Sequence, residues 1–244
     1  MSILQTLPFN LSESGPEEVE GVGNFCLKIL DHAPSNVPRS TLYFLDSHGQ
    51  VPSRTRNPDY DHIKQSQIDW FTRSARQRDD DANHVHLSLV FQHIPLPEFA
   101  DSRLIIHSGH REEPPEGPSL NSHFYDALVR EGVSAFGCGH DHVNDFCALL
   151  PRRALPDDYQ NNTQCGPWLC YGGASGFGGY CSYGRASFHR RARVWELDTS
   201  KGSLYTWKRI EYAASRVDEL ALFHNGSLVG NNGEQERGKS SLLR

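Results

Sequence analysis

Short apolar runs alternate with amphipathic segments along this chain, and their spacing predicts both strands and helices. Residues 41–46 form a β-branched and aromatic run that ends at a Ser-His-Gly sequence, which predicts a buried strand entering a loop. Residues 21–30 predict a neighbouring strand, paired with the first like a hairpin. Over residues 63–77 the apolar side chains recur at helical spacing with charged residues opposite, which predicts an amphipathic helix.

Two further predicted strands each lead into a histidine-bearing loop. Residues 85–91 carry large apolar side chains at the odd positions, which predicts a half-buried strand with His93 at its end. Residues 133–138 predict a second strand, followed at once by Gly-His-Asp-His at residues 139–142. A short helix capped near residues 121–122 separates them. Because open α/β sheets place ligands at the carboxyl ends of their strands, we expect both loops to share one site.

The last third of the chain changes to a β pattern. Residues 192–197 and 203–209 alternate between apolar and polar side chains around a Lys-Gly turn, which predicts a closing hairpin. From residue 219 onward the sequence is rich in Asn, Gly and charged residues, so residues 219–244 are predicted to form a flexible polar tail. Residues 1–218 are then one α/β domain, a size at which a substantial core can be buried.

Composition narrows the class of protein. The 244 residues include 24 Lys and Arg against 30 Asp and Glu, a net charge of -6, which argues against a nucleic-acid binder. The first residues lack the features of a signal peptide, and no apolar stretch reaches the length of a membrane span. The sequence therefore predicts a soluble protein without a membrane segment, and it leaves the cellular compartment open.

The cysteines and histidines differ in what they indicate. Six cysteines without a C-x-x-C pair are interpreted as mostly reduced, with one or two bridges between Cys138 and Cys170 left open for an exported protein. A zinc module built on Cys165, Cys170 and Cys181 is a weak alternative, because no histidine lies at ligand spacing. Thirteen histidines are unusual and invite a search for metal ligands, since neutral imidazole is a common metal ligand.

The histidines in the 139–142 loop carry the strongest chemical signal. The glycine allows a tight turn, and two histidines separated by one residue can reach two neighbouring metal ions. The same spacing occurs at residues 84–86, so the spacing alone is weak evidence.

Other candidate features favour structural interpretations. The glycine-rich residues 172–179 lack the Lys-Ser/Thr of a phosphate loop and fit a close-packed turn between strands. The histidines at 107, 110 and 123 are expected on a surface loop. The arginines at 190, 191 and 193 are expected to form an ion-paired surface.

Residues 91–98, which include His-Ile-Pro-Leu-Pro-Glu, and residues 137–145 together resemble the C-terminal half of the calcineurin-like metallophosphoesterases. The closer resemblance is to the branch that includes purple-acid-phosphatase-like plant proteins and related fungal phosphatases. It runs from about residue 7 to residue 209 in a consistent order, with further matches at residues 21–24, 42–47, 67–71, 171–180 and 191–197. It implies an α/β sandwich of two mixed β-sheets flanked by helices. It also implies a phosphatase acting on a phosphorylated small molecule or phosphoprotein.

The resemblance implies a ligand set residue by residue. His93 and His140 would bind one divalent metal ion and His142 would bind a second. Asp141 and Asn144 would orient the imidazole rings from behind. Paired cations suit phosphate ester hydrolysis, because they polarise the phosphoryl oxygens and make hydroxide from bound water.

The upstream metal motifs of that family have no match here. These are an Asp-x-His, a Gly-Asp-x-x-Asp and a Gly-Asn-His-(Asp/Glu). Asp46-Ser47-His48 has the first pattern, but its flanks match a later strand of the family. Residues 1–218 are therefore predicted to be the C-terminal portion of such a domain, with its N-terminal half missing, at most a partial metal site and no catalytic residue of its own.

A chain of this kind is expected to be inactive by itself and to expose a sheet edge and an apolar face. The alternative is a non-catalytic pseudoenzyme or truncated product that acts, if at all, as a binding protein.

Overall fold

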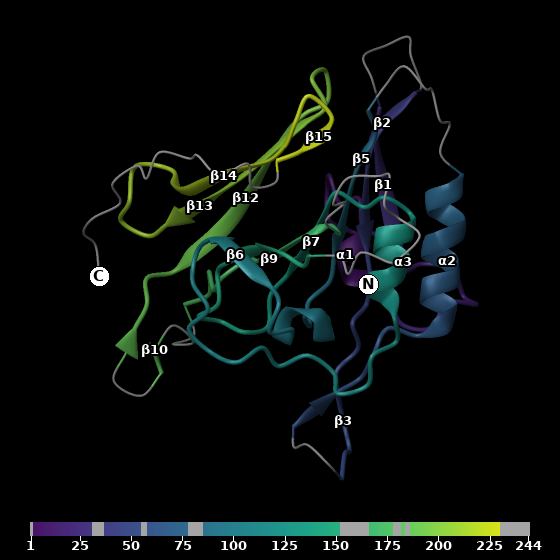
Figure 1. Cartoon of the computed structure of the whole chain (residues 1–244). Helices are drawn as coiled ribbons and strands as arrows, with labels where there is room; N and C mark the ends of the chain where they lie inside the picture. Colours follow the sequence, from purple (N-terminus) through teal and green to yellow (C-terminus); the bar gives the residue numbers. More distant parts are fainter. Residues whose placement is uncertain are drawn as a thin grey trace, which may run out of the picture.

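A computed structural model describes residues 2–30, 37–54, 58–77, 85–151, 166–177, 182–183 and 186–229. Helices cover one face of a seven-stranded sheet, and a four-stranded sheet covers part of the other face (Figure 1). The predicted α/β sandwich is confirmed. Its larger sheet is mixed and its smaller sheet is wholly antiparallel.

The large sheet has the strand order β1-β2-β5-β7-β9-β8-β6. Strands β2, β5, β7 and β9 run parallel at its centre, whereas β1 and β8 are antiparallel to their neighbours. The strands are β1 (Phe25–Leu30), β2 (Pro38–Phe44), β5 (Leu87–Phe91), β6 (Ile105–Ser108), β7 (Ala135–Cys138), β8 (Cys147–Leu149) and β9 (Trp168–Tyr171). The predicted pairing of β1 with β2 is confirmed, and β1 forms one edge of this sheet.

The small sheet contains β12 (Arg191–Asp198), β13 (Ser203–Ile210), β14 (Val217–His224) and β15 (Ser227–Leu228). The β12–β13 hairpin forms as predicted, with Gly202 at the turn in a left-handed conformation, φ 58°. The predicted tail is wrong for its first ten residues, because Leu222 in β14 is fully buried against the large sheet. The exposed polar residues of β14, Glu219 and His224, hide the strand in the sequence. Residues 230–244 lie outside the described residues.

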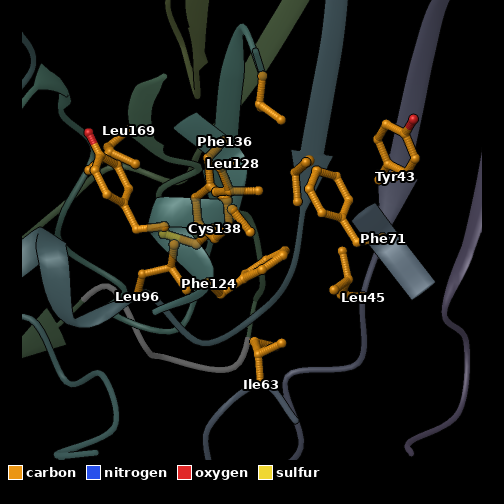
Figure 2. Packing of buried hydrophobic residues seen from close by; sticks show 14 of the residues in the cluster. Tyr43, Leu45, Ile63, Phe71, Leu96, Phe124, Leu128, Phe136, Cys138 and Leu169 are labelled. Atoms are coloured by element: carbon orange, nitrogen blue, oxygen red, sulfur yellow. The ribbon is translucent and has the colours of Figure 1, made fainter. Parts of the chain in front are cut away.

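Two helices cover the opposite face of the large sheet. They are α2 (Gln65–Arg76) and α3 (Phe124–Arg130), which lie side by side in Figure 1 and contact each other. Figure 2 shows Phe71 of α2 in the apolar core between sheet and helices, where its ring centroid lies 5.0 Å from Tyr43 and 5.4 Å from Phe124. Smaller elements are α1 (Ser2–Gln5), η1 (Pro97–Ala100), β3 (Gln50–Val51), β4 (Asp59–Tyr60), β10 (Ser182–Tyr183) and β11 (Ala186–Ser187).

Two local predictions need correction, and one open alternative is decided. Strand β5 is buried on both faces, because it lies between two parallel neighbours under helices and a second sheet. His107 lies in β6 and its ring packs edge-on against Trp168 at 4.9 Å, so it is not a loop residue. Cys147 and Cys170 are register partners in β8 and β9 and form a disulfide, one of the bridges that the sequence left open, whereas Cys26 and Cys138 are free thiols.

Candidate metal centre

His93 and His140 lie close together because the strands that precede them, β5 and β7, pair in parallel. Strands β5 and β7 are adjacent, with Phe91 opposite Gly137. Two backbone hydrogen bonds extend the ladder beyond the strands, from Gln92 N to the Gly137 carbonyl and from Gly139 N to the His93 carbonyl. The carboxyl ends of these two strands therefore bring the two histidine loops together, as the sequence predicts.

The predicted ligand histidines His93 and His140 lie side by side, and His142 is near enough to His93 to act on its charge. The ring centroids of His93 and His140 are 5.3 Å apart at an interplanar angle of 83°. Partial desolvation, together with the nearby His142, lowers the pKa of His93, which favours the neutral imidazole that metal ions require. His140 has a φ of 74°, a strained conformation for a residue other than glycine and one that concentrates at functional sites.

Asp141 and Asn144 join the histidine loop to residues 112–116 by hydrogen bonds. The buried Asp141 carboxylate accepts hydrogen bonds from the Tyr171 hydroxyl and from Glu116 N. Burial raises the pKa of Asp141 to about 6, even though these hydrogen bonds act in the opposite direction. The Asn144 side chain accepts from the backbone N of Glu112 and Glu113 and donates to the Glu113 carbonyl. Both residues therefore fasten the 112–116 segment to the histidine loop.

Residues 112–116 place Glu116, which the sequence analysis did not identify, close to His140. Ligand atoms of Glu116, His140 and Asp141 all lie within 4.8 Å of one another. The Tyr60 hydroxyl donates to the Glu116 carboxylate at 3.4 Å, and the Tyr60 ring lies edge-on to His140 at 4.4 Å. Residues 112–118 are rich in Pro and Glu, which indicates no more than a loop, because the path of this segment depends on contacts with distant residues.

The Asp46-Ser47-His48 sequence fastens loops in this structure. Asp46 accepts hydrogen bonds from Val22 N and His48 N. His48 donates from its ring to the side-chain oxygen of Gln67 at 2.9 Å. These contacts agree with the interpretation of this sequence as a strand-terminating loop.

The fully buried Gln67 is a polar centre that ties the first strands to α2. Its amide group donates to the Asn24 side chain and to the Asp46 carbonyl. Its oxygen accepts from Lys64 N and from the His48 ring. All four hydrogen-bonding positions of the amide are therefore used.

The predicted arginine surface is correct only for Arg190, which pairs with Glu211. Arg191 and Arg193 are directed inward. Arg191 pairs with the buried Asp145 at 2.7 Å and donates to the Val143 carbonyl, next to His142. Arg193 donates to the carbonyls of Tyr171 and Asp145. Their burial was not predicted because their partners lie about fifty residues earlier in the chain or on another strand.

An α/β sandwich whose histidines converge at the carboxyl ends of adjacent parallel strands fits a metallophosphoesterase-type architecture. No family model matches the sequence. The chain is 33% identical to phosphatase DCR2 of Saccharomyces cerevisiae over 92% of its own length. It is 36% and 32% identical to probable inactive purple acid phosphatases 29 and 28 of Arabidopsis thaliana, over 93% and 91% of its length. The chain is thus related to the purple-acid-phosphatase-like metallophosphoesterases.

The similarity covers only part of each relative. It spans 38% of the yeast protein and 60% and 58% of the two plant proteins. Within the described ranges, none of the helices combines the length and apolar character needed to cross a membrane.

Proposed function

We propose that this chain supplies the histidine ligands of a metal-dependent phosphoesterase that hydrolyses phosphate monoesters. The proximity of His93, His140 and His142 at the ends of two adjacent strands, in a chain related to phosphatases, supports the proposal. In it, His93 and His140 hold one divalent ion and His142 holds a second. The substrate is a phosphorylated small molecule or a phosphoprotein.

The residues present fit such ions. Imidazole suits several divalent transition metals, and the lowered pKa of His93 keeps its nitrogen lone pair available near neutral pH. Divalent ions at such a site polarise phosphoryl oxygens and lower the pKa of bound water. Asp141 and Asn144 hold the histidine loop against the 112–116 segment, so that the three rings keep their relative positions.

A complete dinuclear centre needs more ligands than these three histidines. We infer that the chain forms at most part of such a centre and turns over phosphate esters slowly or not at all by itself. A non-catalytic binding protein is the second candidate, favoured by the names of the two plant relatives, which call them probably inactive.

The test compares the full chain with His140→Ala, and with His123→Ala as a control at an exposed histidine just before α3. Mn²⁺ or Zn²⁺ binding is measured by calorimetry, and hydrolysis of 4-nitrophenyl phosphate is measured alongside it. We expect binding that His140→Ala abolishes and His123→Ala leaves intact, with little hydrolysis. Identical binding in all three proteins would refute the ligand assignment. Rapid metal-dependent hydrolysis that is lost in His140→Ala would refute the claim of an incomplete centre.

A further inference from the structure

Glu116 occupies a position that the histidines alone do not explain. Its side chain is exposed, yet it lies with His140 and Asp141 in a group whose ligand atoms are all within 4.8 Å of one another. Atoms that bind one ion at about 2.1 Å lie at most about 4.2 Å apart. The three groups are therefore close enough that side-chain rotation can bring them onto one ion.

The backbone around Glu116 is fixed at several points. Glu116 N donates to both oxygens of Asp141 at 3.2 Å, and Asn144 binds the two residues at the start of the same segment. Three residues later, Ser119 donates to Asp59 from both its backbone N and its hydroxyl. The segment is thus anchored on both sides of Glu116, which limits where its carboxylate can go.

Tyr60 restricts the side chain as well. It is buried beside His140, and its hydroxyl reaches a carboxylate oxygen of Glu116. A tyrosine that touches both a histidine ring and a carboxylate holds the two groups on the same side of the cluster. A fixed carboxylate loses little conformational entropy when it binds an ion.

Charge favours a role for this carboxylate in metal binding. Three neutral imidazoles offer no negative charge to a divalent cation, and oxygen-preferring ions such as Mn²⁺ bind best where carboxylates are present. Glu116 is exposed and can reach an incoming ion without leaving its anchored segment.

We propose that Glu116 is a direct metal ligand, which binds the ion held by His140 and so gives this chain a mixed histidine and carboxylate site. The inference rests on the proposed function, because it assumes that His140 binds a metal ion. It adds a ligand from the segment between β6 and α3, which the sequence resemblance did not supply.

The test titrates Mn²⁺ into the full chain and into Glu116→Gln, Glu112→Gln and His140→Ala, with the free ion followed by electron paramagnetic resonance. Glu112→Gln is the matched control, since its side chain is exposed in the same segment and lies outside the cluster. We expect Glu116→Gln to weaken binding by about tenfold or more, as removing groups around bound metals does. Glu112→Gln should bind like the unaltered chain.

The outcomes separate this inference from the proposed function. Unchanged binding in Glu116→Gln, with binding lost in His140→Ala, overturns the role of Glu116 and leaves the histidine assignment standing. No binding by the unaltered chain overturns both. The visible absorption of bound Co²⁺ provides a second readout, because its bands depend on the ligand set. Weaker binding in Glu116→Gln with an unchanged Co²⁺ spectrum would mean that the charge acts from a distance, which also overturns direct ligation.

Discussion

Replacing Asp145 by Asn should destabilise the protein more than any exposed charge substitution. Asp145 is only 5% exposed, and its carboxylate lies 2.7 Å from Arg191 and 2.8 Å from Lys208. These two cations are 6% and 2% exposed. Asn has nearly the same shape and can still accept the hydrogen bond from His110 N, but its amide NH2 would then face Arg191 and Lys208, so the substitution removes both the charge and the acceptor of these two cations. Arg191 would then be left buried without its carboxylate partner.

The magnitude follows from these distances. A unit charge pair at about 2.7 Å and an effective dielectric constant of about 20 attracts by about 6 kcal/mol. Relief of carboxylate desolvation offsets part of this loss, and breaking buried ion pairs costs about 3–5 kcal/mol in practice. We expect a loss of about 4 kcal/mol in the free energy of unfolding, and a Tm lower by roughly 8–16 °C for a chain of this size.

Urea unfolding followed by tryptophan fluorescence measures this loss. Glu196→Gln is the control, since Glu196 and Arg216 form an exposed pair that should contribute little. A loss below about 1 kcal/mol in Asp145→Asn would refute the reasoning, because it would mean that the two cations find other partners or water.

The pH dependence of stability is a second test of the ion pairs between Asp145 and the cations Arg191 and Lys208. Burial alone would raise the pKa of Asp145, but Lys208 and Arg191 outweigh it and hold that pKa below the usual value. A depressed pKa contributes stability that is fully present above the unfolded-state pKa of about 3.9 and is lost as the pH falls toward the folded-state value. The difference in stability between the unaltered chain and Asp145→Asn should therefore narrow below about pH 4. A difference that stays constant down to pH 2 would contradict the assignment.

Two further substitutions test other parts of the fold. Gln67→Met keeps the volume of a buried side chain but leaves Asn24 and the Asp46 carbonyl with fewer hydrogen bonds, so stability should fall by at least about 2 kcal/mol in urea unfolding. A fall under 0.5 kcal/mol, on the order of a surface change, would count against it. Reducing the Cys147–Cys170 disulfide should cost about 3 kcal/mol, since the bridge closes a loop with a sequence separation of 23; equal urea midpoints for oxidised and reduced protein would contradict this.

The sequence was informative wherever local pattern decides structure. The histidine loops after β5 and β7 were predicted because apolar strands ending in polar residues are visible in a short window. Strands β6 and β8 were missed because they have only four and three residues and, unlike the equally short β7, neither leads into a conspicuous motif. The strand β14 was missed for a different reason, since polar residues interrupt its apolar ones and its flanks are rich in turn residues.

The site residues divide in the same way. His93 and His140 follow strands, so their meeting depends on strand pairing that the sequence pattern indicates. Glu116 and Tyr60 come from irregular segments whose positions depend on Asp141, Asn144 and Asp59. Contacts between side chains and backbone leave no periodic pattern in the sequence. The proximity of Glu116 and Tyr60 to the histidines could therefore be found only from the structure.

The four-stranded sheet supports the candidate metal centre although it supplies none of the proposed ligands. The histidine loop is irregular and closely covered, so its backbone carbonyls need hydrogen-bond donors from elsewhere. Strand β12 provides them, with Arg191 donating to the Val143 carbonyl and Arg193 to the Asp145 carbonyl. The cost of burying these guanidinium groups is offset by Asp145, which belongs to the same loop region. The histidine loop, the two arginines and Asp145 therefore stabilise one another. The positions of the histidines thus depend on how the four-stranded sheet packs against the loop.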